Sequence, residues 1–299
     1  MKSSLYALPC FNHVEKISTV SSGLSQSCFK IFADSKVYFA KTISNNTEVL
    51  VAESAGYSDL GPTVIYHDDS WLVSEFIETS NLALSTLNTE NKIAYTIKLM
   101  IQCHQLNTLP DQLNPNELIY SLVDKPHYSA IQQTALLAFS QLILTPLENT
   151  KQGVCCHGDL NFTNVLMDEV QSTSWLIDYE CACTAPIEFD IAMLIAVNNL
   201  DNKVKKITIE QYENQSSVKV DQLLLNHYLL FSYLINALWY FNVSYEKTQN
   251  EDKKALLKHA EAQWYALHSS LKITDSPLLS SLSIKLTNVL TTLDFSNQT

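Results

Sequence analysis

Three side chains in the middle of the chain have the types and the spacing that phosphoryl transfer needs. Asp159 follows a His-Gly pair, Asn164 comes five residues later, and Asp178 ends a short apolar run. Transfer through a loose transition state requires an aligned nucleophile and neutralised charge rather than covalent work by the protein. A lone Asp after Gly is most often a turn residue. Hard oxygen donors in this order, however, suit Mg²⁺ bound to phosphate, which favours a functional triplet.

The scarcity of glycine excludes two common ways of holding a nucleotide. The chain has only five glycines, and no G-x-G-x-x-G dinucleotide fingerprint can be drawn from them. Gly56 and Gly61 have the spacing of a Walker A loop, but Pro62 and Thr63 follow where Lys and Ser/Thr are required. Phosphate must therefore be held in another way.

Composition and charge limit the classes of partner. The 299-residue chain is 46% hydrophobic, which is ordinary for a globular protein with a sizeable core. Its net charge of −12 opposes a broad grip on nucleic acid, so we expect no nucleic-acid partner. An acidic field suits a cationic small substrate, although it serves solubility equally well.

Neither the cysteines nor the apolar segments suggest a secreted or membrane protein. The seven cysteines have no disulfide-framework spacing, and the first residues lack the apolar core of a signal peptide. Residues 223–241 are nearly long enough to span a bilayer but include polar residues that are costly in lipid. We expect a buried helix there, and a cytoplasmic protein without membrane insertion.

The first third of the chain is predicted to form strands, and most of the rest helices. The strand candidates are residues 29–32, 37–40, 63–66 and 71–74, with a hairpin turn at Asp34-Ser35 and a helix at about 47–59. Together they predict a five-stranded sheet with one helix. Helical spacing then links Ile93, Ile97, Met100 and His104, and likewise Ile131, Ala135, Ala138 and Leu142. We expect an α+β fold of two lobes, a small β-rich lobe at residues 1–77 and a larger helical lobe at 78–299.

These motifs resemble those of the choline/ethanolamine kinase, thiamine kinase and aminoglycoside phosphotransferase superfamily, relatives of protein kinases that act on small molecules. The strongest match is the H-G-D-x-x-x-x-N loop at residues 157–164, followed by I-D-x-E at 177–180 and F-D-I-A at 189–192. Weaker matches cover a small-lobe turn at residues 60–62 and a hinge at 73–78. The resemblance implies a bilobal protein-kinase-like fold and the use of ATP and Mg²⁺.

The resemblance also implies roles for the residues of the catalytic loop. Asp159 would be the catalytic base, and Asn164 and Asp178 would bind magnesium. His157 and Asp190 would brace the loop through hydrogen bonds rather than take part in the chemistry.

Nucleotide binding is assigned by the same resemblance. Lys41, on the third strand, would reach the α- and β-phosphates, and Glu48 would pair with it from the following helix. Glu53 is the competing partner for Lys41. The family often has Arg where this chain has Lys41, which leaves the subfamily open.

Two further segments are implied in nucleotide binding. Gly23 and Ser25 lie in a stretch that resembles the short nucleotide loop of the family, with Gln26 where Asn is common. The backbone from Glu75 to Ile77 would bind adenine.

The acceptor is expected to be a small molecule with a hydroxyl group, held mostly by the helical lobe. Glu180, Trp239 and Tyr240 are the candidate contacts, since aromatic faces attract cations and a carboxylate would assist. Aromatic residues at helical spacing nonetheless belong more often to a hydrophobic core than to a cation-binding site. Thiamine and choline are both cations with a primary hydroxyl, and aminoglycosides are cationic as well, so these acceptors remain open.

Two other classes of protein share parts of this motif set. A catalytically silent kinase-like scaffold predicts the loss of a catalytic residue, yet Asp159, Asn164, Asp178 and Lys41 are all present. A protein kinase would carry D-F-G, A-P-E and Gly-rich motifs, which this chain lacks. A small-molecule kinase is therefore the favoured interpretation.

Overall fold

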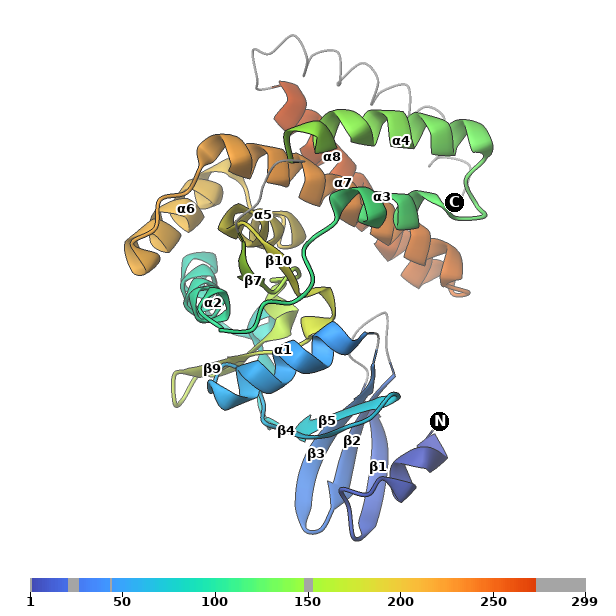
Figure 1. The fold of residues 1–299 in the computed structure, drawn as a ribbon, viewed down its shortest axis with the longest axis vertical. Helices are drawn as coiled ribbons and strands as arrows, with labels where there is room; N and C mark the ends of the chain where they lie inside the picture. Colours follow the sequence, from blue (N-terminus) through green and yellow to red (C-terminus); the bar gives the residue numbers. More distant parts are fainter. Residues whose placement is uncertain (1, 21–26, 44, 148–152, 273–299) are drawn as a thin grey trace. The chain divides into compact units, whose positions relative to one another are not determined.

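The computed structural model describes residues 2–20, 27–43, 45–147 and 153–272. The chain divides into two compact units, whose elements can be followed along the sequence in Figure 1. Unit 1 contains Met1–Gln112, Val154–Ala185 and Asn214–Ser216, and unit 2 contains Leu113–Gly153, Pro186–Glu213 and Ser217–Thr299. Unit 1 thus extends past residue 77, and the division into lobes at that residue stays a prediction.

Unit 1 contains the predicted five-stranded sheet. Its strands are antiparallel and follow the order β1-β2-β3-β5-β4. The strands are β1 Val14–Val20, β2 Cys28–Ala33, β3 Lys36–Thr42, β4 Val64–His67 and β5 Trp71–Glu75. The predicted hairpin joins β2 and β3. Its turn residues Asp34 and Ser35 both have positive φ, 51° and 63°, which matches the right-handed twist of the paired strands.

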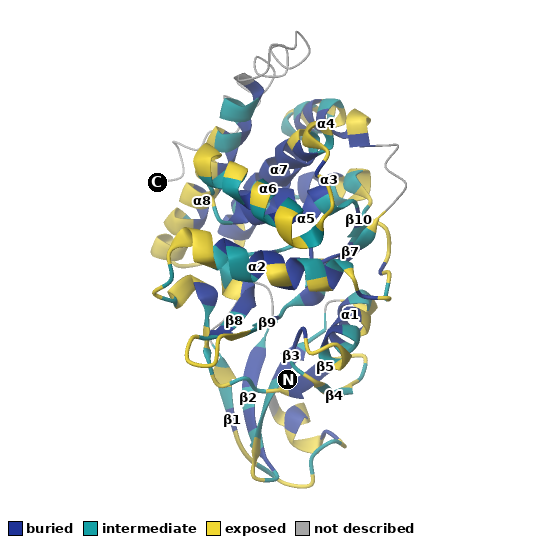
Figure 2. Ribbon diagram, turned by 90° about the vertical axis from the view of Figure 1, so that its left-hand side faces the viewer, coloured by how far each residue is buried: buried dark blue, intermediate teal, exposed yellow. Residues whose placement is uncertain are grey.

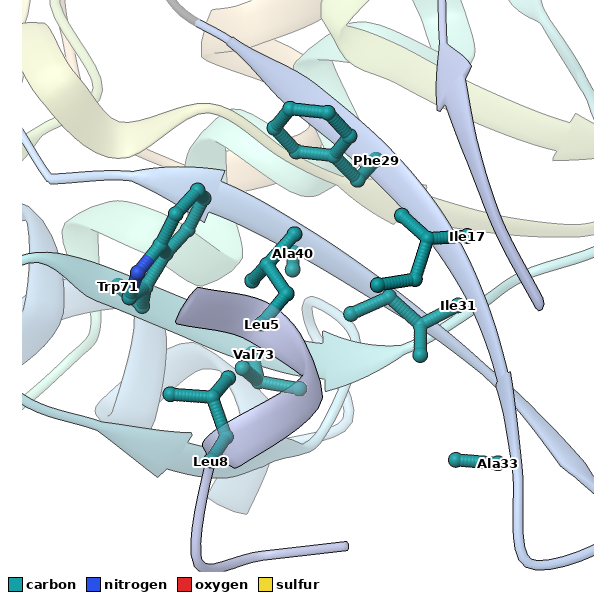
Figure 3. Close-up of a cluster of buried hydrophobic side chains, with 9 residues drawn as sticks. All are labelled: Leu5, Leu8, Ile17, Phe29, Ile31, Ala33, Ala40, Trp71 and Val73. Atoms are coloured by element: carbon teal, nitrogen blue, oxygen red, sulfur yellow. The ribbon is translucent and has the colours of Figure 1, made fainter. Parts of the chain in front are cut away.

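The two faces of this sheet differ in the side chains that they carry. One face packs under the short N-terminal helix η1 (Lys2–Ala7) and forms a cluster of buried apolar side chains (Figure 3). The cluster consists of Leu5, Leu8, Ile17, Phe29, Ile31, Ala33, Ala40, Trp71 and Val73. Because successive side chains of a strand point to opposite faces, Lys41 lies on the face away from Ala40 and the cluster. The apolar face thus packs against η1, and Lys41 lies on the opposite face.

The remaining elements of unit 1 follow β3 and β5 or return later in the chain. Helix α1 is Asn46–Tyr57, close to the predicted residues 47–59, and α2 is Thr89–His104. The shorter elements are β6 Ser80–Asn81, η2 Leu82–Leu84, β7 Val154–Cys156, η4 Phe162–Asn164, β8 Val165–Asp168, β9 Thr173–Leu176, η5 Tyr179–Cys181 and β10 Cys183–Ala185. They form the pair β10-β7 and the three-stranded sheet β6-β8-β9, which hold the chain on either side of the Asp159 loop.

Unit 2 is helical. Its elements are α3 Pro115–Val123, α4 Ala130–Leu144, η3 Thr145–Leu147, α5 Ile187–Val197, most of α6 Asn202–Ser216, α7 Gln222–Glu246 and α8 Asn250–Lys272. Helix α7 contains the apolar stretch at residues 223–241, and its side chains are mostly buried (Figure 2). The prediction of a buried helix is confirmed there. A β-rich start followed by a mainly helical remainder also confirms the predicted α+β class.

Helix α4 shows a difference between prediction and structure. The helix is present, but Ile131 on the predicted stripe is 76% exposed, while Leu136, Phe139 and Ile143 are buried. The sequence of α4 is apolar on more than one side, so its packing against α3 and α7 decides which stripe is covered.

One helical stretch in the described part of the chain, Ala130–Leu147, is long and apolar enough to cross a membrane by length and composition. Its buried residues Leu136, Phe139, Ser140, Ile143, Leu144 and Leu147 recur at helical spacing.

Candidate active site

Lys41 is the centre of a buried charge cluster in unit 1. Lys41 lies on β3 and is 6% exposed, and its ammonium group contacts Asp178 Oδ1 at 2.5 Å. The same group forms an ion pair with Glu48 in the first turn of α1, which is 1% exposed. Glu53, the competing candidate, instead lies 3.4 Å from His67 Nε2. The structure therefore pairs Lys41 with Glu48.

The two carboxylates keep the lysine charged. Burial alone would lower the pKa of Lys41, but the negative charges of Asp178 and Glu48 and their hydrogen bonds outweigh burial. The result is a pKa raised to about 12. An ammonium group that stays charged at neutral pH is a suitable donor for a phosphate group.

His157 joins the loop of Asp159 to the segment of Asp178. Its fully buried ring accepts a hydrogen bond at Nδ1 from the Asp159 backbone N–H (3.2 Å). Because Nδ1 is an acceptor, a neutral ring carries its proton on Nε2, which lies 2.9 Å from the Ile177 carbonyl oxygen and donates to it. One imidazole thus links the residue before Asp178 to Asp159 itself.

Asn164 makes a second connection between the same two segments. Its Nδ2 donates to Asp159 Oδ2 (2.9 Å) and to the Asp159 carbonyl oxygen (3.0 Å). Its own carbonyl oxygen accepts from the Ile177 N–H at 3.0 Å. With Nδ2 committed to Asp159, the Oδ1 of Asn164 is the side-chain atom left to face a ligand.

The backbone around these side chains tolerates few substitutions. Gly158 has a φ of +80°, and a Cβ at this position would lie 2.1 Å from the Cys181 carbonyl oxygen. Only glycine fits both the left-handed conformation and this close approach. Asp178 is itself left-handed, with a φ of 71°. Such backbone conformations persist where surrounding contacts fix them, as Lys41 and His157 do here.

The hinge candidates lie at the end of β5. The Glu75 N–H donates to the Thr63 carbonyl oxygen (2.9 Å), and the Ile77 carbonyl oxygen accepts from Thr79 N–H (2.9 Å). Among the described residues, the Ile77 N–H has no hydrogen-bond partner. The nucleotide-loop candidates Gly23 and Ser25 lie outside the described residues.

The remaining candidates are divided between the two units. Glu180 is half-buried in η5 of unit 1. Trp239 and Tyr240 are half-buried on α7 of unit 2, with ring centroids 5.1 Å apart, and Asp190 is fully buried on α5 of unit 2. A shared acceptor site and the bracing role of Asp190 therefore stay predictions.

Sequence reasoning missed Asn45. Its side chain caps α1 by accepting from the Glu48 N–H at 2.8 Å, and its Nδ2 donates to the Glu180 carbonyl oxygen at 3.1 Å. The capping role had a signal, since Asn before a helical run with Glu three residues later marks a helix start. The contact with Glu180, which is 135 positions away, had none.

Comparison with known protein sequences finds similarity to phosphotransferases. Residues 104–220 match the family model described as "Phosphotransferase enzyme family". Relatives include Probable choline kinase 2 of Arabidopsis thaliana, 32% identical over 77 residues, or 26% of this chain and 22% of that protein. Probable choline kinase 3 of the same plant is 24% identical over 160 residues, or 50% of this chain and 45% of that protein. The matched regions thus span less than half the length of these two curated relatives.

Solved structures extend the similarity to nearly the whole chain. Choline kinase LicA from Streptococcus pneumoniae has a TM-score of 0.69 and 19% identity, covering 90% of this chain and 97% of that one. A choline/ethanolamine kinase family protein from Mesorhizobium loti has a TM-score of 0.66 and 13% identity, covering 95% and 97%. Spectinomycin phosphotransferase APH(9)-Ia, in complex with ADP and spectinomycin, has a TM-score of 0.59 and 15% identity, covering 95% and 98%.

The fold is therefore protein-kinase-like, of the type found in kinases of small molecules. The predicted resemblance to the choline/ethanolamine kinase and aminoglycoside phosphotransferase superfamily is confirmed, and residues 104–220 are similar to the phosphotransferase enzyme family.

Proposed function

We propose that this protein is an ATP-dependent, Mg²⁺-requiring kinase that transfers the γ-phosphate to a hydroxyl group of a small, cationic metabolite of the choline, ethanolamine or thiamine type. One observation carries the proposal. Lys41 contacts Asp178, and His157 and Asn164 join the Asp178 segment to Asp159. A phosphate-binding cation, an acidic metal ligand and a carboxylate base are thereby linked within one compact unit.

Asp159 is the proposed general base. Its Oδ2 accepts a hydrogen bond from Asn164 Nδ2, which holds the carboxylate in a fixed orientation. A carboxylate held in this way can orient an acceptor hydroxyl and take its proton. His157 and Asn164 keep Asp159 in register with Asp178 through the two bonds to Ile177. Their work is positional, because phosphoryl transfer depends mainly on alignment and charge.

Asp178 and Asn164 are the proposed ligands for magnesium. Carboxylate and amide oxygens are the donors that Mg²⁺ prefers, and the committed Nδ2 of Asn164 leaves an oxygen of this kind. Bound there with ATP, the ion would neutralise charge on the phosphates. Lys41, held charged by Asp178 and Glu48, would contact the α- and β-phosphates.

Asp178→Ala is expected to weaken Mg·ATP binding and to shift the magnesium concentration needed for half-maximal activity upward. Titration of activity with Mg²⁺ at fixed ATP measures this shift. An unchanged magnesium dependence would remove Asp178 from the metal site.

The adenine is proposed to bind along the backbone from Glu75 to Ile77. The Ile77 N–H, which has no partner among the described residues, is a donor of the kind that an adenine ring nitrogen accepts. Gly23 and Ser25 are proposed to bind the phosphates of the nucleotide.

The choice of acceptor rests on charge and on the relatives. A net charge of −12 favours a cation, and the relatives are named as choline kinases. Glu180, Trp239 and Tyr240 are the proposed acceptor contacts. An aminoglycoside-type acceptor is the second candidate, since APH(9)-Ia covers 95% of this chain. We further propose action in the cytoplasm on a free metabolite, without nucleic acid and without membrane insertion.

The test is ATP consumption with choline, ethanolamine, thiamine, homoserine, spectinomycin and other aminoglycosides offered one at a time. Acceptor-dependent ADP formation with choline, ethanolamine or thiamine supports the proposal. Activity with aminoglycosides alone moves the protein to the second candidate. Nucleotide binding without turnover on any acceptor favours the scaffold and contradicts the proposed activity.

A further inference from the structure

Asn45 closes a ring of contacts around the Lys41 cluster. Its Oδ1 accepts from the Glu48 N–H at 2.8 Å, and its Nδ2 donates to the Glu180 carbonyl oxygen at 3.1 Å. The Glu48 side chain pairs with Lys41, which contacts Asp178, and Asp178 lies two residues before Glu180. The path from Asn45 through Glu48, Lys41, Asp178 and Glu180 therefore leads back to Asn45.

The amide is suited to this position for a chemical reason. One end must accept from an N–H of α1, and the other must donate to a carbonyl oxygen of η5. Asn carries the acceptor and the donor on two separate atoms of one short side chain. An ionised Asp has no donor, and Ser or Thr has its donor and acceptor on a single oxygen. The two bonds also fix the orientation of the amide group.

The ring joins the two segments that carry the carboxylate partners of Lys41. Glu48 begins α1, and Asp178 precedes η5. If α1 and η5 separated, Lys41 would have to follow one carboxylate and leave the other. Asn45 resists that separation at the outer end of the ring, where its side chain is exposed.

We propose that Asn45 is a positioning residue that holds α1 against the Asp178 segment and so prepares Lys41, Glu48 and Asp178 for Mg·ATP. The inference rests on the proposed kinase function. It adds that Asn45, which caps α1, acts on Lys41 through Glu48 and the Asp178 segment and thereby affects catalysis.

An ordinary helix cap predicts a different result, and the chain offers a matched control. Asn88 caps α2 of the same unit, is exposed, and accepts from the Asn91 N–H at 2.9 Å. Its side chain has the capping bond without a bond to a distant carbonyl oxygen among the described residues. Ser is a good cap, so Asn45→Ser and Asn88→Ser both keep the cap, and Asn45→Ser alone loses the contact with Glu180.

The experiment compares the wild-type chain with both variants in three measurements: melting temperature, Mg·ADP affinity by calorimetry, and kcat and KM for Mg·ATP with the acceptor found active. For Asn45→Ser we expect Mg·ADP affinity to fall and KM for Mg·ATP to rise about three- to tenfold, the range for one lost hydrogen bond. The melting temperatures of the two variants should agree, and Asn88→Ser should keep the nucleotide affinity of the wild type.

Each outcome decides between the proposals. Equal Mg·ADP affinity of wild type and Asn45→Ser overturns the positioning role while the proposed function stands. Equal losses in Asn45→Ser and Asn88→Ser reduce Asn45 to an ordinary cap and overturn it as well. Wild-type protein that binds no nucleotide overturns the proposed function and the inference together.

Discussion

The two units hold their important side chains by different forces. In unit 1, Lys41 and Asp159 are fixed by ion pairs and hydrogen bonds with defined donors and acceptors. In unit 2, α7 is fixed by apolar burial, with Leu225, Phe231 and Leu238 fully enclosed. Hydrogen bonds weaken steeply with distance and angle, whereas apolar burial has no preferred direction. The first arrangement specifies geometry, and the second mainly specifies which surface is covered.

This difference decides what a substitution does in each unit. Replacement of one atom in a directional network changes the chemistry while the surrounding packing stays in place. Removal of a ring from an apolar core changes the stability of the whole unit. The predictions below test this contrast, from the largest expected effect to the smallest.

Asp159→Asn is expected to lower kcat by at least about a hundredfold, the scale for loss of a general base. The variant should still fold, because an amide oxygen can accept from Asn164 Nδ2 as Oδ2 does now. Steady-state kinetics on the active acceptor and calorimetry with Mg·ADP measure the two effects separately. Asp111→Asn, at an exposed position of unit 1, is the matched control. Near-normal turnover of Asp159→Asn would remove this residue from the mechanism.

Phe139→Ala is expected to lower the free energy of unfolding by about 3–5 kcal/mol, since it removes a buried ring. Ile131→Ala, on the same helix, should change it by no more than about 0.5 kcal/mol. Phe139 is 1% exposed and Ile131 76% exposed, so the pair differs mainly in burial. Urea unfolding measures both variants. Similar losses at the two positions would contradict the packing of α4 and the contrast between the units.

The same contrast explains which parts could be predicted from the sequence. The spacing of Asp159, Asn164 and Asp178 is a local pattern, and the structure joins these residues through Asn164 and His157. The turn at Asp34-Ser35 was also predictable, because few residues adopt the positive φ that a tight hairpin needs.

Features that depend on distant partners could not be predicted. The buried face of α4 is chosen by α3 and α7, and an apolar helix offers more than one such face. The contact between Asn45 and Glu180 and the approach of Gly158 to Cys181 both join segments that no local pattern relates. Glu48 and Glu53 both lie on α1, so only the placement of α1 relative to Lys41 could choose between them as its partner.

Lys41→Met tests the smallest effect, the pH dependence of the buried charge cluster. The pKa of Lys41 is raised from 10.5 to about 12 in the folded protein. A raised pKa means that the charged lysine stabilises the fold fully below pH 10.5 and loses this contribution as the pH rises through about 12. The shift corresponds to roughly 2 kcal/mol. Lys41→Met should therefore be less stable than the wild type at neutral pH, and the deficit should narrow by most of this amount between pH 10 and 12. Urea unfolding of both proteins across this range measures the deficit, with Lys36→Met, an exposed position on β3, as the control. If the stability difference between the two proteins stays constant across this range, apolar packing of the Lys41 stem rather than its charge stabilises this part of unit 1. The proposed contrast between the two units would then be wrong.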